Sequence, residues 1–362
     1  MAHNRQGINR NVYTSIPWKG NGNRQFPSWT AFYFIIIIRN IVMNRKFIFL
    51  SLIAILSFFA GIISFMPTDA GELPILKNEE DQETGFAVFT EDGDILYVNN
   101  IESIERSITG SITVIADGIK ISNPIGIVEN PPSKSIMSIK DKVIKSLSSN
   151  NQVLIIYIDG LGYNLYRKAL DLGIIPYLES LGKAEKALTV YPTITDVTFA
   201  AMVTGITPKY TGIHSREKKL LEVSTIFDEA AAMGKTSKVI EGNMQIITDE
   251  VETLLNIDEN GNGTIDDEIY NVALEELKDP QDVLLVHFHS YDDFAHKYGP
   301  GSDEALTQLG ILDSYIKDLL DNYDGDVIIT ADHGMHDEGE SGAHGTFSES
   351  DLFIPIWTRV SL

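Results

Sequence analysis

The sequence predicts an α/β core with a mostly parallel central sheet flanked by helices, preceded by a transmembrane or signal segment and a small β-rich module. The core is predicted because, after residue 151, apolar runs of five or six residues alternate with longer amphipathic stretches. The transmembrane or signal segment is an uncharged apolar stretch at residues 47–66, and the module is a series of short β-branched segments between residues 85 and 127.

The composition limits the classes of function. The 362 residues carry 51 acidic against 28 basic side chains, a formal charge of -23, which opposes binding to nucleic acid. The same charge opposes phosphate esters unless bound cations reverse it locally. The chain has no cysteine, so disulfides, thiolate metal sites and cysteine nucleophiles are excluded, and a bound metal needs oxygen and imidazole ligands.

Residues 47–66 match the roughly 20 residues that a helix needs to cross a bilayer. Arg39, Arg45 and Lys46 precede this stretch and only acidic charges follow it closely, so we expect the carboxyl side to lie outside the cell. Its length favours a single-pass anchor in the cell membrane over a cleaved signal, which would give a secreted protein. Residues 1–46 are expected to be a cytoplasmic tail or an over-long gene start.

Residues 72–132 are predicted to form the small β-rich module, with turns rich in Asp-Gly and Asn. The module contains no histidine, so we expect it to act as a spacer or packing element. A linker at residues 131–133 precedes a helix at 138–149, where the catalytic domain, residues 138–362, is predicted to begin.

Candidate metal ligands follow the predicted buried strands, which are residues 153–158, 187–191, 283–288 and 326–331. In open α/β sheets, functional groups gather beyond the carboxyl ends of the strands. The candidates are Asp159, Asp292, His296, Asp332, His333 and His344. Asp292 and His296 would share one helical face, and a glycine beside Asp159 and beside His333 would let the backbone turn tightly. These ligands suit two divalent ions, with zinc favoured.

Thr195 is the candidate nucleophile. It lies between a predicted strand and an apolar stretch that reads as a buried helix, so it is expected at the amino terminus of that helix. Backbone N–H groups and the helix dipole would there favour a phosphoryl group. A divalent metal lowers the pKa of a bound hydroxyl and so supplies the alkoxide. A role as helix N-cap is compatible with this one.

In order along the chain, these motifs resemble the alkaline phosphatase superfamily, and most closely its nucleotide pyrophosphatase/phosphodiesterase branch. The motifs are IDG at Asp159, PTIT at Thr195, VTG and GIH between Thr204 and His214, D-x-x-x-H-x-x-G-P from Asp292 to Pro300, ADHGM around Asp332, and HG at His344. The similarity covers roughly residues 152–362. Metal-dependent phosphoglycerate mutases and sulfatases share the scaffold, but a sulfatase normally needs a cysteine.

The resemblance implies a ligand set for each of two metals. Asp159, Thr195, Asp332 and His333 would hold one, and Asp292, His296 and His344 the other, with Asp293 as the alternative to Asp292. It also implies in-line attack by Thr195, a covalent phosphothreonine and its hydrolysis by water.

Arg216 departs from the resemblance, because diesterases of this branch carry an asparagine at this place. A guanidinium can bind two phosphate oxygens and fits a monoester dianion better than a diester. We therefore expect Arg216 to contact the substrate, whereas His214, Lys218 and Lys219 are interpreted as a solvated basic patch.

A second metal motif follows the pattern of a calcium loop. Its predicted ligands are Asp258, Asn260, Asn262, Thr264 and Asp266. Position 12 of the loop is Ile269 instead of glutamate, so Glu268 or Asp267 would have to supply the bidentate carboxylate. The alternative is a surface turn rich in Asn and Gly.

The predicted function is therefore metal-dependent hydrolysis of phosphodiester or pyrophosphate bonds by an extracellular phosphoric ester hydrolase. The alternatives are a phosphomonoesterase, a transferase of phospho-head-groups and a non-catalytic surface protein. A membrane anchor would fit a lipid or cell-wall substrate, and no nucleic-acid partner is expected.

Overall fold

The computed structural model describes residues 72–78, 84–248 and 250–361. The predicted tail at residues 1–46 and the predicted anchor at 47–66 lie outside the described residues. Within the described ranges, no helix is both long and apolar enough to span a membrane. The predicted anchor therefore stays a prediction. Gly71–Leu362 forms one compact unit.

The core is an 8-stranded sheet in the order β12-β11-β13-β9-β14-β17-β10-β8. The strands are β12 (Glu252–Leu255), β11 (Ser237–Glu241), β13 (Val283–Phe288), β9 (Val153–Ile158), β14 (Asp326–Ala331), β17 (Phe353–Arg359), β10 (Glu185–Leu188) and β8 (Lys134–Ser135). Only β17 runs antiparallel to its neighbours, β14 and β10. The predicted α/β class with a mostly parallel sheet is confirmed.

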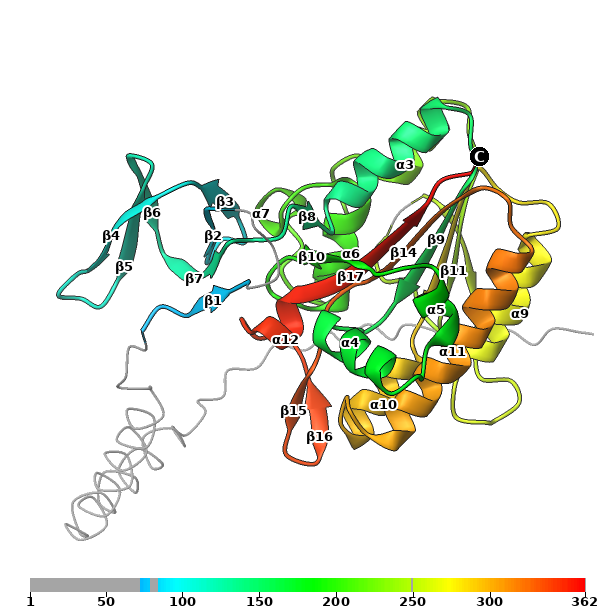
Figure 1. Cartoon of the computed structure of the whole chain (residues 1–362). Coiled ribbons are helices and arrows are strands. Elements are labelled where there is room, and N and C mark those ends of the chain that lie inside the picture. The colour runs from blue at the N-terminus through cyan, green and yellow to red at the C-terminus, as the bar shows by residue number, and fades with distance from the viewer. Residues whose placement is uncertain (1–71, 79–83, 249, 362) are drawn as a thin grey trace, which may run out of the picture. The chain divides into compact units, whose positions relative to one another are not determined.

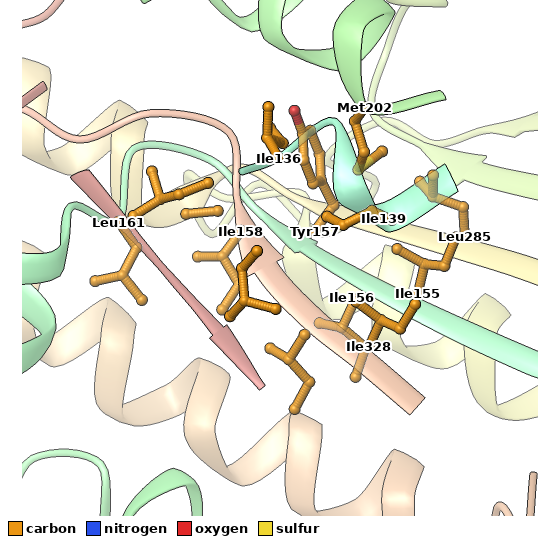
Figure 2. Close-up of a cluster of buried hydrophobic side chains, with 14 of the residues drawn as sticks. Ile136, Ile139, Ile155, Ile156, Tyr157, Ile158, Leu161, Met202, Leu285 and Ile328 are labelled. Atoms are coloured by element: carbon orange, nitrogen blue, oxygen red, sulfur yellow. The ribbon is translucent and has the colours of Figure 1, made fainter. Parts of the chain in front are cut away.

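Three strands at the centre of the sheet set the position of the site. Every residue of β9, β13 and β14 is buried, which explains their continuous apolar sequences. Figure 2 shows Ile155 of β9 close to Leu285 of β13, and Ile155 pairs with Leu285 on one side and with Ile328 of β14 on the other. Ile158 pairs with the last residues of both neighbours. The residues that follow these three strands therefore emerge at one edge of the sheet.

Helices cover both faces of the sheet, with α3 and α6 on one side and α4, α5, α9 and α11 on the other (Figure 1). The helices are α3 (Ser138–Ser148), α4 (Tyr163–Asp171), α5 (Pro176–Ser180), α6 (Thr195–Thr204), α7 (Pro208–Thr211), α8 (Ile226–Ala232), α9 (Asp266–Glu276), α10 (Ser290–Tyr298), α11 (Asp303–Asp321) and α12 (Glu349–Leu352). All residues of α6 are buried, as its apolar sequence indicates. The helix predicted at residues 138–149 is observed as α3.

The predicted β-rich module contains two small sheets, in the orders β1-β7-β2-β3 and β4-β5-β6. The strands are β1 (Ile75–Lys77), β2 (Phe86–Thr90), β3 (Ile95–Val98), β4 (Ile101–Arg106), β5 (Ile112–Ala116), β6 (Ile119–Ser122) and β7 (Pro124–Glu129). Phe89 of β2 packs edge-on against Phe347, with ring centroids 5.1 Å apart. The limits of the module as a separate domain, residues 72–132, stay a prediction.

The strand predicted at residues 187–191 is shifted. β10 covers Glu185–Leu188, and Thr189 still donates its N–H to the carbonyl of Leu352. The chain then leaves the sheet towards Pro192, which has no N–H to extend the hydrogen bonding. A hairpin of β15 (His336–Glu338) and β16 (Ser341–Ala343) precedes the loop with His344.

Candidate active site

Four elements bring the predicted ligands to one edge of the sheet. Asp159 follows β9, Asp332 and His333 follow β14, Asp292 and His296 lie on α10, and His344 lies between β16 and α12. Gly160 has φ +79, and a Cβ on it would stand 2.9 Å from Asp292 Oδ1. A Cβ on Gly334 would clash with the Ser350 carbonyl oxygen. The sequence places glycine at these points because no side chain fits there.

The first predicted ligand group is tightly clustered. His333 Nε2 lies 3.1 Å from Asp332 Oδ2, 3.5 Å from Asp159 Oδ1 and 3.4 Å from Thr195 Oγ1. All four side chains are buried. Thr195 is the first residue of α6, and the N-cap position belongs to Ile194. The Thr195 hydroxyl is therefore directed towards the ligand cluster instead of capping the helix.

The second predicted group lies beside the first. Asp292 Oδ2 stands 3.3 Å from His296 Nε2, and the rings of His296 and His344 are 5.0 Å apart. Asp292, and not its neighbour Asp293, makes this contact. The ring of His344 also stacks on His333 at 3.8 Å, and ligand atoms of Asp292, His333 and His344 lie within 4.8 Å of one another. His333 thus stands between the two groups.

The predicted histidine ligands share one hydrogen-bonding pattern. His333 Nδ1 bonds to the Gly334 carbonyl at 3.1 Å, His296 Nδ1 to that of Gly342 at 2.9 Å, and His344 Nδ1 to that of Thr193 at 2.7 Å. Because a carbonyl only accepts, each Nδ1 must carry the hydrogen. Each Nε2 is then left with a lone pair, the arrangement of a metal-binding histidine whose second nitrogen donates to the protein.

Each carboxylate of the first and second ligand groups has one oxygen without a hydrogen-bond partner among the described residues. Asp159 Oδ1, Asp292 Oδ1 and Asp332 Oδ2 are buried and accept no hydrogen bond within the described part of the chain. Burial, and next the charge of Asp332, raises the pKa of Asp159 and of Asp292 well above the usual range. Unpaired buried carboxylates are costly, and divalent cations would remove that cost. Nitrogen and carboxylate donors of this kind fit zinc.

A cavity of about 450 Å³ opens onto this edge and is lined by Thr195, Asp159 and Asp292. Its wall also contains Arg216 and Lys219. Arg216 Nε lies 4.0 Å from Asp196 Oδ2, and Lys219 Nζ lies 3.3 Å from Asp196 Oδ1. Arg216, the predicted substrate contact, therefore lies in the wall of the same cavity as Thr195. Lys219, which we interpreted as part of a solvated patch, also faces the cavity.

Sequence reasoning missed three residues next to Asp159, namely Glu241, His287 and His289. Glu241 ends β11, His287 lies in β13 and His289 follows that strand. The opposing charges of His287 and His289 outweigh the effect of burial and lower the pKa of Glu241 to about 2. The sequence His-Phe-His at residues 287–289 was the signal that could have found the two histidines. Alternate residues of a strand share one face, so this pattern places His287 and His289 on the same side.

The predicted calcium loop connects β12 to α9 and is mostly exposed. Asp258 accepts hydrogen bonds from the N–H groups of Gly261, Asn262 and Gly263. Asp266 has a different role from the one predicted. It is buried, and its carboxylate accepts the N–H groups of His289 and Ser290 at 2.8 and 3.0 Å. It thereby fixes the start of α10, and calcium binding by the remaining loop residues stays a prediction.

Part of the chain is similar to a known protein family. Residues 227–348 match the model of the type I phosphodiesterase / nucleotide pyrophosphatase family. Over 101 residues the chain is 32% identical to GPI ethanolamine phosphate transferase 3 of Eremothecium gossypii, which covers 26% of this chain and 10% of that protein. Over 78 residues it is 32% identical to the Homo sapiens protein "GPI ethanolamine phosphate transferase 3, catalytic subunit". This match covers 21% of this chain and 7% of that protein. The chain thus matches a tenth or less of these relatives.

Solved structures also align with this fold. Phosphonoacetate hydrolase from Sinorhizobium meliloti 1021, bound to phosphonoformate, aligns with a TM-score of 0.41 and 17% identity, over 62% of this chain and 60% of that one. An inactive murine ectonucleotide pyrophosphatase / phosphodiesterase 5, bound to AMP, aligns with a TM-score of 0.42 and 19% identity, over 52% and 59%. The family match confirms the predicted resemblance to the type I phosphodiesterase / nucleotide pyrophosphatase branch.

Proposed function

We propose that this protein hydrolyses phosphodiester or pyrophosphate bonds through attack by the hydroxyl of Thr195. The observation that carries the proposal is the position of this hydroxyl. Thr195 Oγ1 lies 3.4 Å from the free nitrogen of His333, at the first residue of α6, and Thr195 lines the cavity together with Asp159 and Asp292. The free N–H groups and the dipole of the first turn of α6 would favour a phosphate group here.

Two divalent ions, with zinc preferred, are part of the proposal. Asp159, Thr195, Asp332 and His333 would hold one, and Asp292, His296 and His344 the other. When bound, such ions lower the pKa of the threonine hydroxyl and neutralise charge on the phosphate. The support is the unpartnered carboxylate oxygens and the free Nε2 atoms described above.

The residues of the cavity would orient the substrate. Arg216 and Lys219 bring two positive charges, and Asp196 between them brings one negative charge. These three residues together carry a single positive charge, which matches a phosphodiester monoanion better than a monoester dianion. Thr195 would attack in line with the leaving group and form a covalent phosphothreonine, which water then hydrolyses.

The test compares substrates on the purified full chain reconstituted with zinc. We would measure kcat/KM for a nitrophenyl phosphodiester, a nitrophenyl phosphomonoester and a dinucleotide. Thr195→Ala should abolish turnover, whereas Thr204→Ala is the matched control, because Thr204 lies at the far end of the same helix and bonds to Ala200. Preference for the monoester would overturn the diester assignment. No turnover of any substrate by the zinc-loaded protein would favour the non-catalytic alternative.

Transfer of a phospho-head-group is the second candidate, favoured by the match to GPI ethanolamine phosphate transferases. Asp293 also lines the cavity, and its carboxylate could attract the ammonium group of ethanolamine. The predicted anchor would keep such an enzyme close to a lipid donor. Phosphatidylethanolamine vesicles with a soluble alcohol acceptor test it. Transfer to the alcohol, at a rate exceeding release to water, would identify a transferase.

A further inference from the structure

Beside the proposed ligand groups lies a second cluster that neither of them uses. It consists of Glu241, His287 and His289, around the side of Asp159 that faces away from His333. The cluster forms because β11 and β13 are adjacent and parallel, and β13 in turn pairs with β9, which ends before Asp159. Three neighbouring strands thus deliver its members to the same edge of the sheet.

Glu241 fixes both imidazole rings. Its Oε2 lies 2.9 Å from His287 Nδ1, and its Oε1 lies 2.6 Å from His289 Nε2. Glu241 and His287 are 1% and 0% exposed, so these contacts are shielded from water. Because a carboxylate accepts, each of these two ring nitrogens donates, and in the neutral ring the other nitrogen keeps its lone pair. Those nitrogens are His287 Nε2 and His289 Nδ1.

Both of the remaining nitrogens face the same oxygen of Asp159. His287 Nε2 lies 3.7 Å and His289 Nδ1 3.5 Å from Asp159 Oδ2. These distances exceed those of a good hydrogen bond. His287 Nε2 is buried and makes no hydrogen bond to any described residue. A buried polar atom of this kind needs a partner that the protein chain does not supply here.

The spacing fits a metal ion. Two ligands that each lie about 2.0–2.1 Å from a tetrahedral zinc stand about 3.4 Å apart. The atoms of the first ligand group show comparable separations, 3.4 Å from His333 Nε2 to Thr195 Oγ1 and 3.5 Å to Asp159 Oδ1. One ligand atom each from Asp159, His287 and His289 lies within 4.8 Å of the others.

We propose that Asp159, His287 and His289 bind a third divalent cation, with Glu241 holding both imidazoles in the orientation for binding. Asp159 would bridge two cations, with Oδ1 directed towards the first ligand group and Oδ2 towards the new site. The new site therefore rests on the proposed two-metal centre, extends it and shares one residue with it. Carboxylate-bonded histidines are the usual form of zinc-binding histidine. Asp159, Glu241 and His289 line the cavity, which gives the cation a path of entry.

Metal content tests the proposal without relying on activity. The full chain is stripped with a chelator, reloaded with zinc, dialysed and analysed by mass spectrometry for zinc per chain. We expect about three equivalents in the wild type and about two in His289→Ala. Glu241→Gln, which keeps the size of the side chain, should weaken the third equivalent about 10–100-fold. His214→Ala is the control, because His214 is an exposed histidine that lies outside this cluster and outside both proposed ligand groups.

The outcomes separate this proposal from the two-metal one. If the wild type and His289→Ala both hold about two equivalents, the third site is overturned and the two-metal centre stands. If the wild type holds none, both proposals fail. Anomalous scattering at the zinc edge from wild-type crystals gives a readout that does not depend on the folding of a variant. A peak between Asp159, His287 and His289 would support the site, and its absence beside occupied neighbouring sites would overturn it.

Discussion

Replacement of Asp351 by alanine should loosen the loop that carries His344. Asp351 is fully buried, and its carboxylate accepts hydrogen bonds from Thr346 N, Thr346 Oγ1 and His336 Nδ1, each at 2.8 Å. Thr346 follows His344 by two residues. Asp351 therefore ties α12 to the loop and positions a predicted metal ligand that it does not touch.

The magnitude follows from these three bonds. Hydrogen bonds to a charged group contribute about 1.5–3 kcal/mol each. Thr346 is exposed and the His336 side chain is 28% accessible, so water can replace part of the loss. We therefore expect Asp351→Ala to lower the free energy of unfolding by about 2–4 kcal/mol. By analogy with other residues that orient a metal ligand, zinc affinity at the second ligand group should fall about 10–100-fold.

Two measurements check this expectation. Urea unfolding of the chelator-treated protein gives the stability, and competition with a zinc-binding dye gives the affinity. Glu349→Ala is the matched control, since Glu349 is an exposed acid in the same helix. A stability loss below about 1 kcal/mol would refute the hydrogen-bond reasoning. Full stability loss with unchanged zinc affinity would refute the link between Asp351 and His344.

Three further changes test other parts of the site. Gly160→Ala should lower the free energy of unfolding, measured in urea, by about 1–2 kcal/mol, because a φ of +79 disfavours a side chain. The added Cβ should also displace Asp292 and so weaken zinc binding, and an unchanged zinc titration would contradict this. Burial, with the charge of His333, lowers the pKa of His344 to about 4 from 6.5, so the unfolded state binds the extra proton. The metal-free protein should therefore lose stability as the pH falls from 6.5 towards 4. Over the same pH range, the melting temperature of His344→Gln should fall less than that of the wild type. Arg216→Ala should raise KM for a phosphodiester about 3–10-fold with little change in kcat, and an unchanged KM would remove Arg216 from the substrate contacts.

The central strands could be predicted from the sequence because they are buried on both faces. β9, β13 and β14 have the bounds that their apolar runs indicate. β11, with the sequence SKVIE, was missed because its first residues are polar and only partly buried. β17 was missed because Pro355 interrupts its apolar pattern. The sheet tolerates this proline because Pro355 pairs with β10 but lies beyond the pairing with β14, which ends at Ile356.

The site residues that directly follow an apolar strand could be predicted from the sequence. Asp159 and Asp332 follow buried strands, so their approach to each other follows from a parallel sheet. The place of Glu241 beside His287 could not be predicted, because it depends on β11 lying next to β13, and strand order is not written in local sequence. Asp266 fitted the spacing of a calcium ligand, but only the fold reveals that it holds the start of α10.

Covalent trapping on Thr195 tests the central claim most directly. The zinc-loaded full chain would be mixed with a nitrophenyl phosphodiester, quenched in acid within the first turnover, digested and mapped by mass spectrometry. The account predicts that the peptide containing Thr195 gains the mass of the transferred phosphoryl group, and that Thr195→Ala neither gains it nor turns over. Turnover by Thr195→Ala at the wild-type rate, with no modified peptide in either protein, would contradict the account.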